Sequence, residues 1–348
     1  MAGTMIHEPA GTRDLEAVRA PGKPRLGFAG VGWIGRHRLE AVVEAGCAEV
    51  VVIADPVAEH ARAAAEAVPQ ARVTDDLADL ARADIDGVVI ATPSALHAEQ
   101  AMAVLETGRA VFCQKPLGRT AAEVRAVVDA ARAANALLGV DLCYRKTAAM
   151  QRVRRLVTDG ELGRVYAAHL MFHNAYGPDK PWFHDRRLSG GGCLIDLGVH
   201  LADLALWTLG RPVITRVSGR LFREGHRIDR GDPAVEDYAI VRLDLDTGAV
   251  VDLACSWNLP AGRDAVIDAR FFGTDGGAAM RNVGGSFYDF TAEHWRGTAT
   301  ETLCAPPDDW GGRTIIDWAE RLGRGERFDP DIDALIDVAE VLDRAYGR

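Results

Sequence analysis

The sequence predicts an α/β chain with two domains: a doubly wound parallel sheet comes first, and an α+β domain with a large, mostly antiparallel open sheet follows. Three observations carry this prediction. Up to about residue 144, short strands that are apolar throughout alternate with Ala-rich helical stretches, as in a parallel sheet that helices cover on both faces. Beyond that point, apolar and polar residues alternate, as in strands with one solvated face. The 348 residues, 48% of them hydrophobic, are enough for two cores.

The first domain is predicted to span residues 24–144. A flexible leader is expected before it, over residues 1–23, because these hold acids and prolines but no apolar stretch of signal-peptide length. The helices of this domain are expected to end near residues 45, 68 and 107, and the last to begin near residue 120. The strands between them are expected at residues 25–30, 49–55, 86–93, 110–113 and 136–140.

The second domain is predicted to span residues 145–348. Its strands are expected in four stretches, of which the last two contain the turn sequences DTG and GTDGG: residues 163–177, 213–225, 236–258 and 265–282. Its helices are expected near residues 148–159, 190–207, 313–322 and 331–346. The final helix is placed where it can pack back on the first domain.

Charge, hydropathy and cysteine usage argue against several classes of function. A formal net charge of -10 without a basic run disfavours nucleic acids and anionic membrane surfaces as partners. No apolar run reaches the roughly 18 residues that a membrane span needs. The six cysteines include no CxxC pair, which is typical of reduced thiols and favours the cytoplasm.

A glycine-rich loop, GFAGVGWIG, joins the first strand to the first helix. Gly30 permits a tight turn, Gly32 lets a pyrophosphate approach the backbone, and Gly35 permits close packing of helix on strand. The N-terminus of the helix favours the phosphate charge. We therefore predict a dinucleotide-binding loop, and we count Trp33 and Ile34 among the residues that bind the cofactor.

Asp55 ends the second strand, 20 residues after Gly35. A carboxylate at this place accepts hydrogen bonds from a ribose diol and repels a 2′-phosphate, so we predict NAD rather than NADP. The alternative is that Asp55 only starts a turn in the sequence ADP.

Polar residues follow two further strands, in ATPSALH at residues 91–97 and in CQKPL at residues 113–117. Ligands of doubly wound sheets lie beyond the carboxyl ends of the strands. We therefore expect Thr92, His97 and Lys115 to face the nicotinamide half of the cofactor. Pro93 and Gln114 are also counted among the residues that bind the cofactor. The alternatives are that Lys115 is a solvated amine and that His97 faces water.

A polar stripe interrupts the apolar helix GGGCLIDLGVHLADLALW at residues 190–207. Asp196, His200 and Asp203 lie at offsets of four and seven, which on an α-helix places their side chains within roughly 60° of one another. Taken alone, the stripe also fits the solvated face of an amphipathic helix.

Four segments in order resemble the Gfo/Idh/MocA family of NAD(P)-dependent oxidoreductases, which includes glucose-fructose oxidoreductase and inositol dehydrogenase. They are the glycine loop with its helix, ADP, ATPSALHAEQAMAVLETGRAVFCQKPL and SGGGCLIDLGVHLADLALWTLG, and the likeness is looser beyond Gly210. The resemblance implies a Rossmann domain followed by a substrate and oligomerisation domain. It further implies that Lys115 is the lysine of an EKP motif and that Asp196 and His200 form a DxGxH pair. Gln114 departs from the usual Glu of that motif, which makes the charge beside Lys115 less negative.

From these residues we expect hydride transfer between NAD and a hydroxyl-bearing carbon of a sugar, inositol or related polyol. His200 is the expected general base, Lys115 the donor to the reacting oxygen, and Asp196 the group that orients His200 or binds a neighbouring hydroxyl. Asp203 is expected to support the site. Substrate contacts are expected from the segment HNAYGPDKPWFHDRR, which also fits plain packing: His173, Trp182, His184 and Arg186.

Two alternative functions for this chain fit the same fold. A redox-neutral glycosidase, in which bound NAD transiently oxidises the sugar, uses the same residues. A regulator that only senses the nucleotide lacks the acid-base set, so Lys115, Asp196 and His200 argue against it. No metal site is expected, since the histidines lack ligand spacing. A homo-oligomer, dimer or tetramer, is expected because an open sheet exposes an apolar face.

Overall fold

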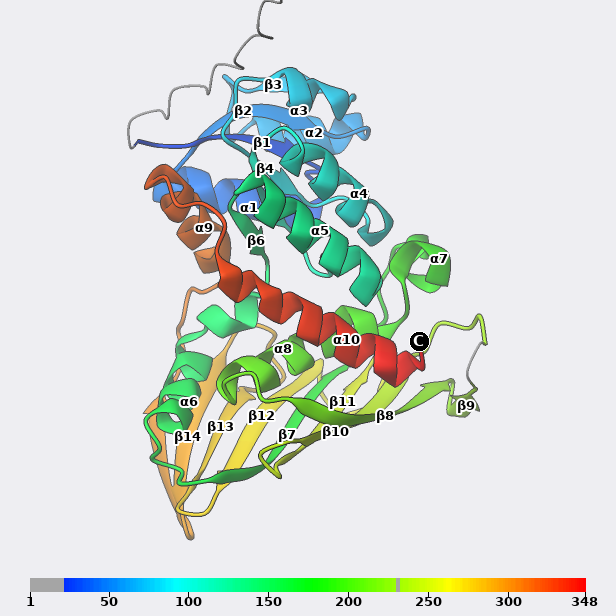
Figure 1. Cartoon of the computed structure of the whole chain (residues 1–348), viewed down its shortest axis with the longest axis vertical. Coiled ribbons are helices and arrows are strands. Elements are labelled where there is room, and N and C mark those ends of the chain that lie inside the picture. Colours follow the sequence, from blue (N-terminus) through cyan, green and yellow to red (C-terminus); the bar gives the residue numbers. More distant parts are fainter. Residues whose placement is uncertain (1–21, 230–231) are drawn as a thin grey trace, which may run out of the picture.

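A computed structural model of the chain describes residues 22–229 and 232–348, so residues 1–21 of the expected leader lie outside the described residues. Two sheets stand one above the other along the long axis of the molecule, and helices α8 (Val199–Thr208) and α10 (Ala334–Tyr346) lie between them (Figure 1). Within the described residues, no helix is long and apolar enough to cross a membrane.

The first sheet confirms the predicted doubly wound parallel fold. Its six strands within the described residues are all parallel and stand in the order β3-β2-β1-β4-β5-β6, which is the Rossmann order. The strands are β1 (Arg25–Ala29), β2 (Glu49–Ala54), β3 (Arg72–Thr74), β4 (Gly87–Ile90), β5 (Ala110–Cys113) and β6 (Leu138–Val140). The helices are α1 (Trp33–Ala45), α2 (Ala58–Ala65), α3 (Ala78–Arg82), α4 (Ser94–Leu105) and α5 (Ala121–Ala134).

Among these elements, β3 and α3 were not expected from the sequence. Strand β3 has three residues and none of them is buried, whereas β4 and β5 are buried throughout. A short exposed edge strand carries no apolar run, which is the signal by which the other strands were recognised.

The second sheet confirms the mostly antiparallel prediction. Its nine strands within the described residues stand in the order β15-β14-β13-β12-β7-β11-β10-β8-β9, and β7 with β11 is the parallel pair among them. The strands are β7 (Val165–Asn174), β8 (Ile214–Arg223), β9 (His226–Ile228), β10 (Tyr238–Leu245), β11 (Val250–Ser256), β12 (Ala265–Gly273), β13 (Gly277–Asn282), β14 (Phe290–Arg296) and β15 (Ala299–Cys304). The last two strands lie beyond the stretches expected from the sequence.

One face of the second sheet packs against α6 (Ala148–Thr158), α8 and α10, and the other face is open (Figure 1). The open face was expected to be broadly apolar, and part of it is charged. Asp268 on β12 pairs with Arg270 at 2.6 Å and with Arg281 at 3.3 Å, and Arg281 lies 3.5 Å from Glu293. A ladder of charged side chains therefore crosses this face.

After the second sheet the chain returns to the first. Helix α9 (Arg313–Gly323) inserts Trp318 into the core of the parallel sheet, where its ring lies 5.6 Å from that of Phe112. Gly87 and Gly139 leave room for this indole, because a Cβ atom on either would lie within 3.0 Å of it. Helix α10 then runs along α5, and the Asp343 carboxylate accepts a hydrogen bond from Ala121 N at 2.8 Å.

Candidate active site

The glycine loop leaves open space at the N-terminus of α1. Gly30 has φ +83°, and a Cβ atom on Gly35 would lie 2.2 Å from the carbonyl oxygen of Gly30, so both positions require glycine. Gly32 differs, because a Cβ atom there would meet nothing closer than His60, at 3.8 Å. The residues present thus fit a bound dinucleotide, since Gly32 leaves the backbone open to a pyrophosphate.

Asp55 fixes this loop from the end of β2. Its carboxylate accepts hydrogen bonds from the Val31 N–H at 2.7 Å and from the Val57 N–H at 2.8 Å. The second bond is the turn that the alternative interpretation expected. Each oxygen keeps a free lone pair, so the same carboxylate is able to accept ribose hydroxyls. His60, not predicted from the sequence, lies 3.7 Å from it.

Four other predicted cofactor residues reach the surface near the carboxyl ends of β1 and β4. Trp33 is 59% exposed at the start of α1, and Ile34 beside it is half-buried. Pro93 is exposed, and the Thr92 hydroxyl donates to Gln100 at 2.6 Å. These positions are compatible with the predicted role.

His97 has a different role from the one predicted. Its side chain is buried, and its two ring nitrogens lie 2.7 Å from the carbonyl oxygens of Thr92 and Pro116. Burial lowers the pKa of His97, and the two carbonyl groups act in the opposite direction. Since both nitrogens are engaged, His97 ties together the loops that follow β4 and β5 and keeps no ring nitrogen free for a ligand.

Gln114 belongs to a buried network next to Lys115. Its amide donates to Asp141 Oδ2 at 2.5 Å, and Arg38 Nε on α1 donates to the same oxygen at 2.6 Å. Asp141 follows β6, and its Oδ1 is buried without a partner among the described residues. A carboxylate therefore does lie beside position 114, but Asp141 supplies it.

Lys115 crosses from the first sheet to the second domain. Its Nζ donates to Asp196 Oδ1 at 2.6 Å and to the Asp196 carbonyl oxygen at 2.9 Å. The indole N–H of Trp257 donates to Asp196 Oδ2 at 3.1 Å. Lys115 is therefore not a free surface amine, because Asp196 holds it against the wall that Trp257 forms.

The helix that carries Asp196 begins differently from the prediction. Residues Leu194–Gly198 form a π-helical turn before α8 starts at Val199. The wider π turn changes the angle between Asp196 and His200 from that of a regular α-helix. The stripe is also not a solvated face, since His200 and Asp203 are buried and Asp196 is bonded to Lys115.

The glycines before this turn make room for a buried acid. Glu236 Oε1 accepts hydrogen bonds from Gly192 N at 2.8 Å, Leu194 N at 3.0 Å and the Tyr346 hydroxyl at 2.7 Å. A Cβ atom on Gly192 would lie 1.9 Å from the Glu236 carbonyl oxygen, and one on Gly191 2.0 Å from the Tyr346 hydroxyl. Glu236 therefore caps the start of the site helix, which the sequence did not reveal.

His200 is buried in the first turn of α8. It is 5% exposed, its ring meets that of Tyr144 edge to face at 4.9 Å, and its two ring nitrogens form no hydrogen bond with a described residue. Burial, and to a smaller extent the charge of Lys115, lowers the pKa of His200 well below its usual value. The imidazole is therefore neutral at neutral pH and able to accept a proton.

Asp203 is a structural anchor. It is buried, and both of its oxygens accept hydrogen bonds from Arg145, one of them at 2.7 Å from Nε. Burial raises the pKa of Asp203, and Arg145 acts against that rise. The pair joins α8 to the segment that follows β6, where Tyr144 contacts His200.

The four residues predicted to contact the substrate lie in different parts of the structure. His184 meets Trp257 at 5.9 Å, and Trp182 stacks at 3.8 Å on Phe183, which itself contacts Trp257. These side chains thus lie next to the catalytic cluster.

The other two turn elsewhere. Arg186 donates to the Asp232 carbonyl at 2.5 Å and lies over the Tyr346 ring, so it faces the C-terminal helix. His173 is buried, bonds Ser256 at 2.8 Å and stacks on Tyr238, and burial lowers its pKa. Trp257, which the sequence did not single out, occupies the place by Asp196; no motif around it marked this contact.

Both domains of the chain match known protein families. Residues 25–142 match the oxidoreductase family with an NAD-binding Rossmann fold, and residues 150–279 match the GFO/IDH/MocA C-terminal domain. The chain belongs to the Gfo/Idh/MocA family. This confirms the resemblance read from the sequence.

Several known proteins are similar to this chain over most of its length. D-glucoside 3-dehydrogenase of Escherichia coli (strain K12) is 31% identical over 67% of this chain and 69% of that protein. 1,5-Anhydro-D-fructose reductase of Ensifer adhaerens is 29% identical over 74% of this chain and 76% of its own. The structure of GenD2 from gentamicin A biosynthesis in complex with NAD has a TM-score of 0.78 and 25% identity, and covers 97% of this chain and 95% of that one.

The family makes this chain an oxidoreductase with an NAD(P)-binding Rossmann domain. Within residues 22–229 and 232–348, no group of three or more His, Cys, Asp or Glu side chains could hold a metal ion. The site is thus built from a dinucleotide loop and from a lysine, a carboxylate and a neutral imidazole.

Proposed function

We propose that the protein is an NAD-dependent dehydrogenase that transfers hydride between nicotinamide and a hydroxyl-bearing carbon of a sugar, inositol or related polyol. One observation carries the proposal: Lys115, bonded to Asp196, and the neutral His200 come together beyond the carboxyl ends of a dinucleotide-binding sheet. The names of similar proteins support it, among them D-glucoside 3-dehydrogenase and inositol 2-dehydrogenase.

In this reaction the bound cofactor supplies the hydride acceptor, and the side chains handle the proton. His200 accepts the hydroxyl proton, which its depressed pKa allows at neutral pH. The Lys115 ammonium has three N–H groups, of which two are engaged by Asp196, and the third donates to the reacting oxygen as negative charge develops there. Trp257 occupies the other oxygen of Asp196 and so keeps this carboxylate aimed at Lys115.

We further propose NAD as the preferred cofactor. The Asp55 carboxylate accepts a hydrogen bond from Val31 of the glycine loop, so it would lie beside the adenosine ribose of a bound dinucleotide and face the 2′-phosphate of NADP. Titrating both dinucleotides while recording Trp fluorescence tests this: NAD is expected to bind more tightly, and Asp55→Ser to narrow the difference. Equal or tighter binding of NADP by the parent protein counts against the assignment.

The reaction itself is tested by screening inositols, aldoses, amino sugars and glycosides for NADH formation. NADH accumulation with a polyol or sugar is expected, and it should survive EDTA. Glycoside release without net NADH would instead show the redox-neutral glycosidase, and activity lost to EDTA and restored by one divalent ion would contradict the metal-free mechanism.

We also propose a cytoplasmic homo-oligomer, dimer or tetramer, in which the open face of the second sheet meets a second copy. Tyr166 and Ile240 are exposed on this face among its charged pairs, and all six cysteines are free thiols. Sedimentation at micromolar concentration tests the assembly, and a monomer there would refute it.

A further inference from the structure

A pocket of about 540 Å³ is lined in part by Trp257, whose indole N–H donates to Asp196. The end of β8, the start of β10 and the chain after β11 form its walls, and His184 lies at its rim. The volume falls in the range of small-molecule sites, about 300–1,000 Å³. Ile240, on the face proposed to meet a second copy, lies at this pocket, but no cofactor or catalytic role assigned above uses its space.

The walls of this Trp257 pocket suit a neutral, hydroxylated ring. Phe222, Tyr238 and Trp257 contribute aromatic surface, with Phe222 and Tyr238 edge to face at 6.0 Å. Neither the Tyr238 hydroxyl nor the Asn258 side-chain amide hydrogen-bonds to another described residue, so both are available to a ligand. Aromatic faces with a few neutral donors and acceptors are what a sugar ring, apolar on its C–H faces and polar at its edge, requires.

The charges in the Trp257 pocket compensate one another. Arg223 Nε donates to Glu224 at 3.1 Å and lies 3.9 Å from Asp237, whose carboxylate accepts from Glu224 N at 2.8 Å. No unpaired charge is thus offered to an ionic ligand by these three residues. This argues against a phosphorylated or acidic occupant.

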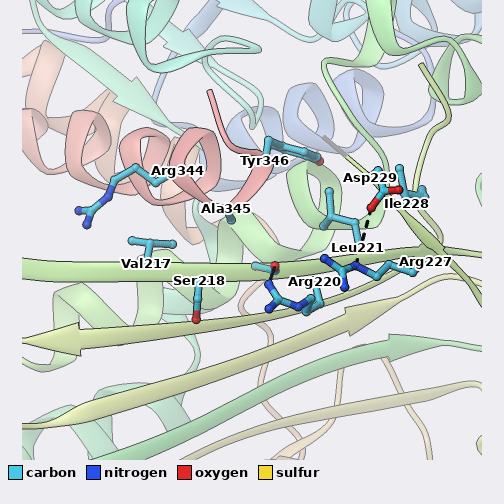
Figure 2. A pocket seen from close by; sticks show the side chains of 11 residues that line it. Val217, Ser218, Arg220, Leu221, Arg227, Ile228, Asp229, Arg344, Ala345 and Tyr346 are labelled. Carbon is cyan, nitrogen blue, oxygen red and sulfur yellow. Dashed lines mark hydrogen bonds and ion pairs between the residues drawn. The ribbon is translucent and has the colours of Figure 1, made fainter. Parts of the chain in front are cut away.

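A second pocket shows the contrast. It lies between β8, β9 and α10, has about 310 Å³, and gathers Arg220, Arg227 and Arg344 (Figure 2). Arg220 donates to the Gly219 carbonyl and Arg344 to backbone carbonyls of β8, so neither has a carboxylate partner among the described residues. That cationic pocket shares no residue with the catalytic cluster, whereas the neutral one shares Trp257 with it.

We propose that the Trp257 pocket holds the second ring of a glycoside while the first ring is oxidised at Lys115 and His200. The inference rests on the proposed function and narrows its substrate class. Sugars that carry a second ring are then better substrates than free hexoses and inositols. Trp257 contacts both places, since it lines the pocket and its indole N–H donates to Asp196 at 3.1 Å. A glycosidic link passing the edge of this indole then joins the two rings.

The test compares kcat/KM for glucose with that for maltose, cellobiose and gentiobiose, using the NAD-loaded full chain. At least one disaccharide is expected to exceed glucose. Tyr238→Ala is expected to lower kcat/KM for that disaccharide about tenfold while changing the value for glucose less than about twofold, because only the second ring reaches residue 238. Val213→Ala is the control, since Val213 is 64% exposed and lines no part of the pocket.

The outcomes separate the two proposals. A protein that oxidises monosaccharides or inositols no less well than every disaccharide overturns the inference and leaves the proposed function standing. Equal loss for glucose and disaccharide in Tyr238→Ala also overturns it, since the residue then acts through the fold. Oxidation of neither class overturns the proposed function together with the inference.

Discussion

The two halves of the active site are built in different ways. The dinucleotide loop is made of neighbouring residues, and its backbone conformation determines its shape. The positive φ of Gly30 and the close approach of the backbone at Gly35 show this. The acid-base cluster draws Lys115 from the end of β5, and Asp196 and His200 from a helix of the other domain. Binding and chemistry should therefore respond separately to substitution.

The largest expected effect separates them directly. Replacing His200 with Asn, or Lys115 with Met, should lower single-turnover NADH formation by about 10² to 10⁴-fold, as loss of general acid-base catalysis does. The NAD dissociation constant should stay nearly unchanged, because the glycine loop and Asp55 hold the nucleotide. His169→Asn, at an exposed histidine on the open sheet face, is the control. A His200 variant that folds, binds NAD and reacts at close to the parental rate would contradict the mechanism.

The second test asks whether the two halves are mechanically joined, since Asp141 links Arg38 of the cofactor helix to the strand end before Lys115. Asp141→Asn leaves Arg38 buried without its charge partner and should cost about 3 kcal/mol of unfolding free energy. Gln114→Glu should also destabilise, because it places a second carboxylate 2.5 Å from the first.

The double variant decides between charge and packing. Asp141→Asn with Gln114→Glu restores one carboxylate in the network and should recover at least half of the lost stability in urea denaturation. If the losses of stability in the two single variants simply add in the double variant, the carboxylate beside Arg38 does not stabilise the fold through its charge.

The third test compares two glycines of the loop. Gly35→Ala should destabilise the fold by about 1–3 kcal/mol, because its Cβ would overlap the Gly30 carbonyl. Gly32→Ala should leave the melting temperature unchanged, since no protein atom lies within 3.8 Å of its Cβ position, yet weaken NAD binding about tenfold. Melting curves and NAD titrations of both variants measure these effects. Unchanged NAD affinity in Gly32→Ala would show that the pyrophosphate does not bind at this loop.

The smallest expected effect is the pH dependence of His200. Since burial places its pKa below the usual 6.5, kcat/KM should hold its plateau down through pH 6.5 and fall only in more acidic solution. The unfolded chain takes up this proton near pH 6.5 and the folded chain does not, so the stability contribution is present above pH 6.5 and is lost as the pH falls below it.

Urea denaturation at pH 7.5 and 5.5 measures this loss, about 1 kcal/mol. His200→Asn should show a smaller loss between the two pH values than the parent chain. An equal loss in both would place the responsible groups elsewhere, for example at the buried His173, whose pKa is also lowered.

Much of the molecule was predictable because its signals are local. Apolar strands between helices predicted the parallel sheet, and alternation predicted the antiparallel one. The glycine spacing predicted the loop, since a positive φ or a close backbone approach excludes other residues at the position itself. Motif order made Lys115, Asp196 and His200 candidates, whereas the bond between Lys115 and Asp196 joins two domains and is visible only in the structure.

Only the tertiary structure determined which side chains contact one another. Trp257 holds Asp196, Glu236 caps the π turn, and Trp318 returns from the far end of the chain to the first core. An indole or a carboxylate looks the same in sequence whether it packs on its own sheet or reaches another one. The sequence by itself thus determined the elements, the loop and the residue types of the chemistry; the arrangement of the side chains depends on contacts between segments distant in sequence, which no local pattern records.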